Sequence, residues 1–495
     1  MNGTHMRDVA AGELATVCQE MLRDGGRMQM AYAWFPKPGE PAELRYLAAP
    51  GARQPFAVWR CRTDGAAVPS LASLSPLLGW YEREMADLCG VRFDGHPEPY
   101  PLVLHEGVEV QMPPLDPRCP REQALPFRQS PWRLPEIESR DVQLLPFGPV
   151  RADVFESAQF LFFYIGEGIL HFHPRLFFKH RGMERRFEGL SPDLGVVLAE
   201  RVSAVGSVAH ALAYCQALET VAGCTVPARA QWLRVLLAEM ERLYNHLHYL
   251  GHLCHTTTLK VGEAEGKLLE ERVKQMNARL TGSRFLRGLL APGGLRRDFD
   301  PSGLGAALTP LAREFTAYVE KLERTNSHLD RLITTGVLSR KVAFDQGAAG
   351  PVERASGLDR DMRRDHPYAA YDDLAFTAAL RETGDAYARA QVRIAEAEAS
   401  LAIIQQVLSR LPEGTVRAPC ALPASRDGLG WSESPRGSLY YSVHIDASGR
   451  LARVKIKSPS FSNWRVFPFT VHDSNMMDYA INEASFGLTI AGCDR

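Results

Sequence analysis

The chain has 495 residues, of which 45% are hydrophobic and 23% charged, and its formal net charge is −1. This is an ordinary globular composition, and the length is sufficient for two or three domains. Acidic and basic residues are balanced and no basic block occurs, so nothing indicates nucleic-acid binding. No apolar run reaches the roughly 18 residues of a membrane span, and the N-terminal stretch lacks the apolar core of a signal peptide. A chain on the cytoplasmic side is expected.

Nine cysteines are scattered along the chain, and no C-x-x-C pair occurs. In a reducing compartment such residues are expected to be free, mostly buried thiols. A metal site built from cysteines alone is therefore not predicted.

The N-terminal part begins with helical spacing over residues 10–24. Strand-like stretches follow at 31–36, 43–50 and 54–62, and Ser75 and Pro76 begin a short helix. This order predicts a small α/β domain over residues 1–112. A proline-rich connector over 113–146 excludes regular helix and central strand, and we expect it to run extended along a partner surface.

The remaining residues, 147–495, predict a bundle of long helices with flanking β-hairpins. The aromatic and β-branched stretch 159–178 indicates an antiparallel hairpin. One long helix is expected from Pro192 to about Val221, with Ser191 as its N-cap and Gly223 beyond its end. Further helices are expected at 227–255, 262–281, 302–335 and within 371–411, and strands after Gly414 with a hairpin turn at 446–449. The predicted fold class of the whole chain is α+β.

Two sets of motifs resemble known families. The run Gly79-Trp80-Tyr81-Glu82-Arg83-Glu84, followed by Gly95-His96-Pro97, resembles the 30-kDa-type subunit of respiratory complex I. Residues 147–495 resemble the large subunit of nickel–iron hydrogenases and the related 49-kDa-type subunit of complex I. Their matching motifs are His180-Arg181-Gly182-Met183-Glu184, Glu241-Arg242-Leu243-x-Asn245-His246, Arg354-Ala355-Ser356-Gly357, Asp361-x-Arg363, Gly384-Asp385-x-Tyr387-x-Arg389 and Glu433-x-Pro435-Arg436-Gly437. Both parts on one polypeptide resemble the hydrogenase-3 and hydrogenase-4 type, which includes the large subunit of formate hydrogenlyase.

The resemblance implies a nickel–iron centre held by four thiolates, two from the first long helix and two from the C-terminus. Alignment on Arg201 and His210 places Ser203 and Gly206 at the first two ligand positions. Alignment on Asp494-Arg495 places Thr489 and Gly492 at the other two, with Cys493 one residue beyond. Hydroxyl groups and glycines do not replace soft thiolates. No nickel–iron centre and no other metal site are therefore predicted in this chain.

Glu184 stands where hydrogenases use a glutamate to hold a structural magnesium ion. Several arginines surround it in sequence, and we expect Glu184 to be an ion-pair partner of Arg181, Arg185 and Arg186 rather than a metal ligand.

The complex I relatives use the same cavity for a quinone head group, with a histidine in the loop after a Gly-Pro pair. Here the loop runs from Gly148 to Asp153, and Arg151 takes the nearest place. Arginine donates hydrogen bonds but does not relay protons, which weakens a role in quinone reduction. Arg151, Asp153 and His210 are the residues expected to line any remaining cavity.

A dense charged set has two interpretations, which both stay open. As the resemblance implies, it forms a network that couples redox events to proton movement; alternatively, it is a buried ion-pair network that fixes the bundle. The set comprises Arg354, Asp361, Arg363, Arg364, Asp365, Asp385 and Arg389, and Glu184 is assigned to the same network.

Four histidines crowd the second long helix. His248, His252 and His255 share a face and have the spacing of a zinc site, but a partly exposed histidine face is favoured. His246 belongs to a family motif and is expected to be buried and hydrogen-bonded.

The resemblance implies a small partner subunit with an iron–sulfur cluster, antiporter-like membrane subunits, and a peripheral position on the cytoplasmic side of a membrane. The first hypothesis is a subunit of a complex I-like, hydrogenase-related oxidoreductase complex that lacks its own nickel–iron centre. It would couple electron transfer from the iron–sulfur partner, with quinone as one acceptor, to ion transport. The alternative is a non-catalytic scaffold, and a third hypothesis is a formate hydrogenlyase hydrogenase. No cofactor bound by this chain itself is predicted.

Overall fold

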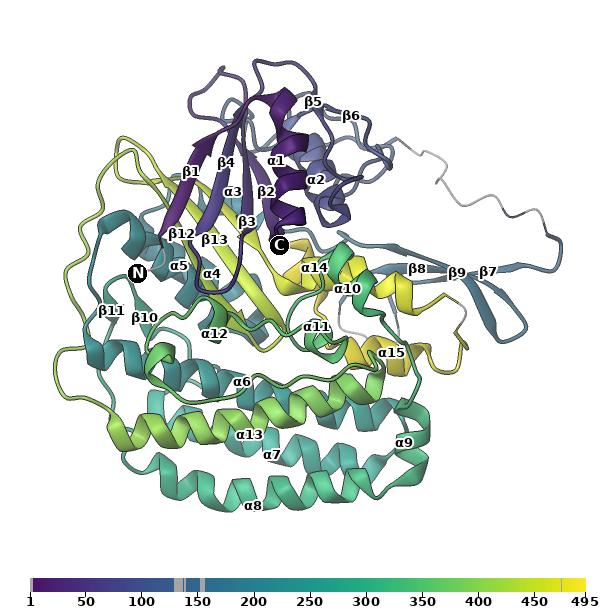
Figure 1. Ribbon diagram of the computed structural model, residues 1–495, viewed down its shortest axis with the longest axis vertical. Coiled ribbons are helices and arrows are strands. Elements are labelled where there is room, and N and C mark those ends of the chain that lie inside the picture. The colour runs from purple at the N-terminus through teal and green to yellow at the C-terminus, as the bar shows by residue number, and fades with distance from the viewer. Residues whose placement is uncertain (1–2, 129–136, 138, 152–155, 473) are drawn as a thin grey trace.

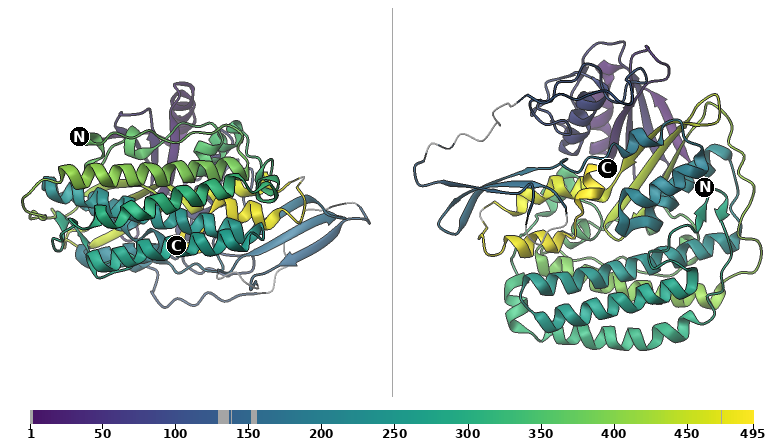
Figure 2. Two further views of the ribbon diagram at one scale, coloured as in Figure 1. Left: turned by 90° about the horizontal axis from the view of Figure 1, so that it is seen from below. Right: turned by 180° about the vertical axis from the view of Figure 1, so that it is seen from behind.

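The computed structural model of the chain describes residues 3–128, 137, 139–151, 156–472 and 474–495. Its fold is α+β, as predicted: a small N-terminal sheet, a central three-stranded sheet and a layer of long helices follow one another across the molecule (Figure 1). A second three-stranded sheet projects from one end as an arm, which is also visible from below and from behind (Figure 2).

The N-terminal sheet has the strand order β1-β4-β3-β2, in which β1 and β4 are parallel and the other pairs antiparallel. Its elements are β1 (Thr4–Asp8), η1 (Ala11–Glu13), α1 (Leu14–Arg23), β2 (Arg27–Trp34), β3 (Glu43–Ala49), β4 (Phe56–Arg62), β5 (Val68–Pro69), η2 (Pro76–Leu78), α2 (Gly79–Cys89) and β6 (Phe93–Asp94). Nearly every residue of β2 and β3 is buried, so both faces of the sheet are covered over these two strands, whereas the edge strand β1 is exposed. Trp34 stacks on His444 at 4.3 Å between ring centroids, which shows that part of this cover comes from the C-terminal half.

The proline-rich connector ends in a strand. β7 (Gln143–Phe147) pairs antiparallel with β8 (Gln159–Ile165), which pairs in turn with β9 (Gly168–Arg175). The sequence predicts the β8–β9 hairpin but not the third strand. Pro146 is tolerated in β7 because this strand lies at the edge of its sheet. Further upstream, Leu115 donates its backbone N–H to Leu88 and Arg185 reaches Cys119, so the described start of the connector packs on its own chain.

The expectation of one long helix from Pro192 to Val221 is wrong. The structure has α4 (Pro192–Val202), a short η3 (Ala204–Gly206) and α5 (Ser207–Ala222), and the two longer helices meet at 115°. Ser203 has extended backbone angles, which ends α4. The Glu241 carboxylate accepts the backbone N–H groups of Val208 and Ala209 at 2.7 and 3.0 Å and so caps the start of α5. Gly223 ends α5 with a positive φ, as predicted.

The long helices pack against one another as a bundle (Figure 2). They are α6 (Ala228–Thr256), α7 (Lys260–Thr281), α8 (Leu304–Glu323) and α13 (Ala386–Arg410). In this bundle, α6 and α8 each contact both α7 and α13. Two expected helices are shorter than predicted. The helix expected over 302–335 breaks at Thr325 before α9 (Asn326–Leu332), and the one expected within 371–411 begins only where Asp385 caps α13.

Short elements lie between the larger ones along the chain. They are α3 (Met183–Phe187), β10 (Leu290–Ala291), β11 (Gly294–Leu295), α10 (Arg340–Gln346), α11 (Pro351–Ala355), α12 (Met362–Asp365) and η4 (Tyr371–Asp373).

The central sheet is an antiparallel meander of β12 (Asp427–Ser434), β13 (Gly437–Ile445) and β14 (Leu451–Lys457), with the predicted turn at 446–449. β12 lies directly on the backbone of α5. A Cβ at Gly430 would stand 2.0 Å from the carbonyl oxygen of Ala213, so only glycine permits this approach. The chain ends with α14 (Pro459–Val466), η5 (Phe467–Thr470), α15 (Tyr479–Phe486) and α16 (Ile490–Asp494).

Within the described residues, no single helix is both long and apolar enough to cross a membrane. The bent α4–α5 pair passes by length and composition, but most of α5 is buried inside the protein.

Candidate functional site

The first two positions that the resemblance assigns to nickel ligands lie at the break between α4 and α5. Ser203 ends α4, Gly206 precedes α5, and His210 follows one turn later. A Cβ at Gly206 would stand 3.4 Å from Cδ2 of His210, so these two residues are neighbours. His210 is 3% exposed, and its Nδ1 lies 2.8 Å from the hydroxyl of Tyr441. Burial lowers the pKa of His210 to about 3, so its imidazole is neutral.

Of the other two assigned positions, Thr489 caps the last helix, α16, and Gly492 lies within it. Thr489 Oγ1 accepts the backbone N–H of Gly492 at 3.2 Å and lies 3.2 Å from Ser460 Oγ. Cys493 is fully buried, and burial raises the pKa of its thiol well above the usual value. A protonated thiol is a poor metal ligand.

One guanidinium group joins the two ends. Arg181 donates to the carbonyl oxygens of Val202 at 2.6 Å, Arg201 at 3.1 Å and Ala491 at 2.9 Å. The α4–α5 break and α16, almost 300 residues apart in sequence, are therefore held together, as the resemblance implies.

The donor set at this junction does not fit a nickel–iron centre. It offers two hydroxyl groups, two glycines and a protonated thiol where soft thiolates are required. Among the described residues, no three histidine, cysteine or acidic side chains are placed to hold a metal ion.

The predicted partners of Glu184 are wrong. Its carboxylate binds Arg453 at 2.6 Å, Lys455 at 3.2 Å and Arg495 at 3.4 Å. α3 directs Glu184 inward onto β14, whereas its sequence neighbours turn elsewhere: Arg185 pairs with Glu188, and Arg181 and Arg186 bind backbone carbonyls. Burial alone would raise the pKa of Glu184, but the three cations hold it below its usual value.

The structure does not bring Arg151 and His210 into contact within the described residues. The Arg151 side chain is buried against Glu483, at 3.2 Å, and its guanidinium lies 4.6 Å from the ring centroid of Phe160. The Arg151 side chain therefore packs against β8 and α15, whereas the His210 side chain contacts β13. Asp153 lies outside the described residues.

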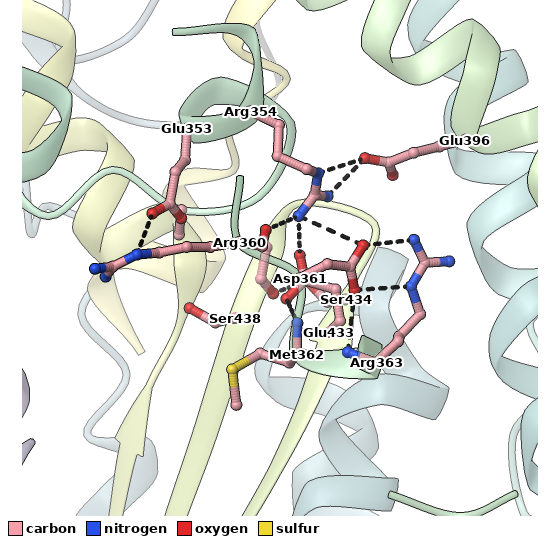
Figure 3. Close-up of polar contacts among 12 residues, drawn as sticks. Glu353, Arg354, Arg360, Asp361, Met362, Arg363, Glu396, Glu433, Ser434 and Ser438 are labelled. Carbon is pink, nitrogen blue, oxygen red and sulfur yellow. Dashed lines mark hydrogen bonds and ion pairs between the residues drawn. The ribbon is translucent and has the colours of Figure 1, made fainter. Parts of the chain in front are cut away.

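Several residues of the predicted charged set meet in a buried charge network, shown in part in Figure 3. We use this name for Glu239, Arg242, His246, Arg354, Asp361, Arg363, Glu396 and Glu433, each at most 3% exposed. Arg354 is its centre, with Glu396 on one side at 2.6 Å and Glu433 and Asp361 on the other at 3.0 and 3.6 Å.

Two further arginines close the network. Arg363 binds Asp361 at 2.7 Å and Glu239 at 3.2 Å. Arg242 binds Glu239 at 3.3 Å and Glu396 at 3.4 Å. His246 Nε2 lies 2.9 Å from Glu396, so this histidine is buried and hydrogen-bonded as predicted.

The charges of the network do not cancel. It contains three guanidinium groups and four carboxyl groups. The guanidinium groups are those of Arg242, Arg354 and Arg363, and the carboxyl groups are those of Glu239, Asp361, Glu396 and Glu433. Burial raises the pKa of Glu433 to about 7. The positive charge of Arg354 opposes this rise, and the negative charge of Asp361 adds to it. Glu433 is therefore the carboxyl of this network that takes up a proton most readily, since the pKa values of Glu239, Asp361 and Glu396 are lowered.

Four members of the predicted set stand apart from it: Asp385, Arg389, Arg364 and Asp365. Asp385 caps α13 by accepting the N–H of Ala388 at 2.7 Å, and also accepts the N–H of Thr334. Arg389 donates to Ser485, Asn482 and backbone carbonyls rather than to a carboxylate. Arg364 pairs with Asp359 and Asp365 at a half-exposed edge.

Sequence reasoning missed Glu239 and Glu396. Glu239, Arg242 and His246 recur every three or four residues on the apolar face of α6, and charged groups at core positions signal a buried polar cluster. Glu396 has the same signal on α13.

The histidines of α6 form a stacked row along its surface. The rings of His248 and His252 lie 6.2 Å apart, and those of His252 and His255 lie 6.1 Å apart. His248 and His255, each about half exposed, pair with Glu270 and Glu263 at 3.0 Å. These acids accept hydrogen bonds from the imidazoles.

Comparison with known families matches both halves of the chain. The family described as the 49 Kd subunit of respiratory-chain NADH dehydrogenase matches residues 268–428 and 421–495, and the 30 Kd subunit of the same enzyme matches 16–123. The family of nickel-dependent hydrogenases matches residues 181–266, which include the α4–α5 break.

Individual relatives cover most of the chain. Formate hydrogenlyase subunit 5 of Escherichia coli K12 is 31% identical over 426 residues, 83% of this chain and 74% of the relative. The C/D subunit of NADH-quinone oxidoreductase from Gluconacetobacter diazotrophicus is 30% identical over 485 residues, which are 86% of this chain and 79% of the relative. Hydrogenase-4 component G of E. coli K12 is 30% identical over 434 residues, which are 84% of this chain and 73% of the relative.

The class is thus that of subunits of complex I-like and hydrogenase-related complexes. The chain belongs to the family that unites the fused 30-kDa and 49-kDa subunits of complex I with the large subunits of hydrogenase-3 and hydrogenase-4 type.

Proposed function

We propose that this chain is a peripheral subunit, on the cytoplasmic side, of a membrane-associated oxidoreductase complex, and that it has no nickel–iron centre of its own. In this proposal it couples electron transfer from an iron–sulfur cluster on a small partner subunit, with quinone as one acceptor, to ion transport by antiporter-like membrane subunits.

The observation that carries the proposal is the contrast between the two buried polar regions. At the α4–α5 junction, the thiolate positions hold Ser203, Gly206, Thr489 and Gly492, and Arg181 ties the surrounding backbone together. The buried charge network, in contrast, has every carboxylate facing an arginine and includes Glu433, whose pKa burial raises to about 7. In this proposal the chain has no metal chemistry of its own but has a buried carboxyl that responds to nearby charge.

Glu433 supplies the physical basis of coupling. A carboxyl with a pKa near neutrality, buried beside Asp361 and Arg354, gains or loses its proton when the charge around it changes. A redox event on a neighbouring subunit is such a change, and proton uptake at Glu433 is the first step of ion movement in this proposal.

The alternative is a non-catalytic scaffold. One observation favours it: Arg151, in the place of the quinone-loop histidine, is fixed by Glu483 and Phe160 and does not relay protons. The third hypothesis is a formate hydrogenlyase hydrogenase. The likeness to formate hydrogenlyase subunit 5 supports it, and the residues at the four thiolate positions argue against it.

Metal analysis and a hydrogen assay test the first part of the proposal. The intact complex, purified with all its subunits, is expected to contain iron but no stoichiometric nickel in this chain, and to evolve no hydrogen from a low-potential donor. Stoichiometric nickel or hydrogen evolution would refute the proposal.

Quinone reduction distinguishes participation in electron transfer from a scaffold role. If the chain participates, Arg151→Gln or His210→Gln lowers quinone reduction by the intact complex, and Glu433→Gln lowers the number of ions moved per electron. Arg324→Gln, a change at a side chain 81% exposed, serves as the matched control. Activity and ion yield that are insensitive to all three site variants would establish the scaffold instead.

A further inference from the structure

A cavity of about 270 Å³ lies between the N-terminal sheet and the C-terminal half. β2 and α2 supply one wall, and α11, α12, β13, β14 and α14 supply the others. Arg151 and His210 do not line it, so it is separate from the α4–α5 junction.

The acidic side chains that line this cavity already have cationic partners. Glu353 binds Arg27 at 2.6 Å and Arg360 at 3.8 Å (Figure 3 shows the second pair). Asp359 and Asp365 both bind Arg364 at 2.8 Å. The remaining two, Asp361 and Glu433, belong to the buried charge network.

Two cationic side chains in the wall have no acidic partner among the described residues. Arg465, on α14, is partly exposed, and its Nη1 is completely buried without a hydrogen-bond partner among the described residues. Glu98 and Glu82 act on its charge without forming an ion pair with it in the described part of the chain. Lys457 is 3% exposed, donates to the backbone carbonyl and the hydroxyl of Ser438, and pairs with no carboxylate in the described part of the chain. An unpaired buried cation is costly, and an anion at hydrogen-bond distance removes that cost.

Two further features fit a bound ligand. His366 is 3% exposed, lines the cavity and has a buried Nδ1 without a hydrogen-bond partner among the described residues. Met28, Tyr81 and Phe461 give the same cavity apolar walls. A few polar groups among apolar side chains are typical of small-molecule sites. Burial lowers the pKa of Lys457 to about 7 and that of Arg465 to about 9, so both groups gain from an arriving negative charge.

We propose that this cavity binds a small organic anion, whose carboxylate or phosphate group contacts Arg465 and Lys457 while its apolar part lies against Tyr81 and Phe461. Because residues of both halves line the cavity, the bound anion also strengthens the contact between the N-terminal sheet and the C-terminal half.

Calorimetric titration of the purified full-length chain, within its complex where it requires one, tests this proposal in a buffer without carboxylates or phosphate. The probes are succinate, inorganic phosphate and the uncharged succinamide. Saturable binding of succinate identifies a carboxylate ligand, and binding of phosphate identifies a phosphate ligand; both support the site. Succinamide is expected not to bind, because it has no charge for the guanidinium to pair.

Variants assign the binding to the cavity. Arg465→Gln is expected to raise the Kd for the bound anion at least tenfold, and Arg324→Gln, on an exposed helix end, to leave it unchanged. If Arg465→Gln does not fold, Lys457→Met takes its place with the same expected direction. Absence of saturable binding up to about 10 mM, equal binding of succinamide, or an affinity that the cavity variant leaves unchanged would each overturn the proposal.

Discussion

The arginine at the centre of the buried charge network decides how much this cluster contributes to stability. Arg354 is fully buried and binds three carboxyl groups, those of Glu396, Glu433 and Asp361. Replacing a whole buried ion-pair cluster by apolar residues is often neutral, whereas removing one partner leaves uncompensated charges behind.

Arg354→Met is therefore expected to destabilise the protein by about 3–5 kcal/mol, because it leaves four carboxyl groups facing two arginines. Urea unfolding of the variant and of the exposed control Arg324→Gln measures the difference. A loss below about 1 kcal/mol, similar to that of a surface ion pair, would contradict the prediction.

A second buried carboxyl links stability to pH. Burial raises the pKa of Glu241 to about 7, against the hydrogen bonds from the N–H groups of Val208 and Ala209. In the unfolded chain its pKa is about 4.5. The folded state therefore holds a proton that the unfolded state releases, and stability falls as pH rises from about 4.5 to 7, by at most about 3 kcal/mol from this group.

Glu241→Gln removes this dependence, since an amide does not titrate. The thermal midpoint of the variant is expected to rise relative to that of the wild type between about pH 5 and pH 8. The comparison uses one buffer series at constant ionic strength. A difference between the two midpoints that stays constant over this range would show that Glu241 does not titrate as stated.

For single residues, the sequence predicts burial and clustering better than it predicts which side chains form ion pairs. The burial of His246 and the clustering of Arg354, Asp361 and Arg363 follow from motifs. The partners of Glu184 do not, because sequence neighbours are a poor guide to charge attraction in the fold. The direction of a side chain on a one-turn helix such as α3 depends on what packs below it, here β14.

At the scale of elements, the bend between α4 and α5 is the main departure from the sequence expectation. Residues 192–221 have helical spacing throughout, and local propensity alone would continue the helix. The break is stabilised from a distance: Glu241 caps α5, and Arg181 binds the end of α4. Such contacts come from tertiary packing, so no pattern within the segment predicts them. In contrast, α6, α7 and the β13–β14 turn carry strong local signals, and their predicted bounds agree within a few residues.

Two glycines of the bent pair test how tightly it is packed. A Cβ at Gly195 would stand 2.0 Å from the hydroxyl oxygen of Tyr214, which donates to Pro192 at 2.9 Å, so this side chain would have to move. A Cβ at Gly206 meets nothing closer than 3.4 Å. Glycine to alanine normally stabilises a helix by about 0.5–1 kcal/mol, so a loss at Gly195 would reveal the clash.

Gly195→Ala is accordingly expected to destabilise the protein by about 1–3 kcal/mol, and Gly206→Ala to change its stability by less than about 1 kcal/mol. Chemical denaturation of both variants provides the comparison. Equal stabilities for the two would mean that α4 and α5 are not packed as closely as the structure has them.

At the scale of the whole molecule, buried charges join the N-terminal part to the rest. Glu84 of α2 binds Lys455 at 2.6 Å and Arg495 at 2.7 Å, and these two cations also bind Glu184. Tyr32 of β2 reaches Ser442 and His444 on β13. The partners lie more than 300 residues apart, and no local pattern indicates which faces meet. The resemblance indicates both parts, but only the structure shows how they dock.

The balance of buried charges between the N-terminal part and the rest predicts which of two substitutions lowers stability more. It holds three cations, Arg453, Lys455 and Arg495, and two carboxylates, Glu84 and Glu184. Glu84→Gln leaves three cations facing one carboxylate, whereas Lys455→Met leaves two of each. Burial disfavours the charged form of Lys455 and lowers its pKa, so its removal also relieves a desolvation cost.

Glu84→Gln is therefore expected to destabilise the protein more than Lys455→Met, by at least about 2 kcal/mol. Because Glu84 lies at the docking face, the N-terminal part of Glu84→Gln should also unfold first, as a separate transition in calorimetry. Glu40→Gln, at a side chain 46% exposed, is the control and should unfold like the wild type. If Lys455→Met is the more damaging change, or if Glu84→Gln unfolds in one transition at the wild-type midpoint, the buried charges do not hold the two parts together.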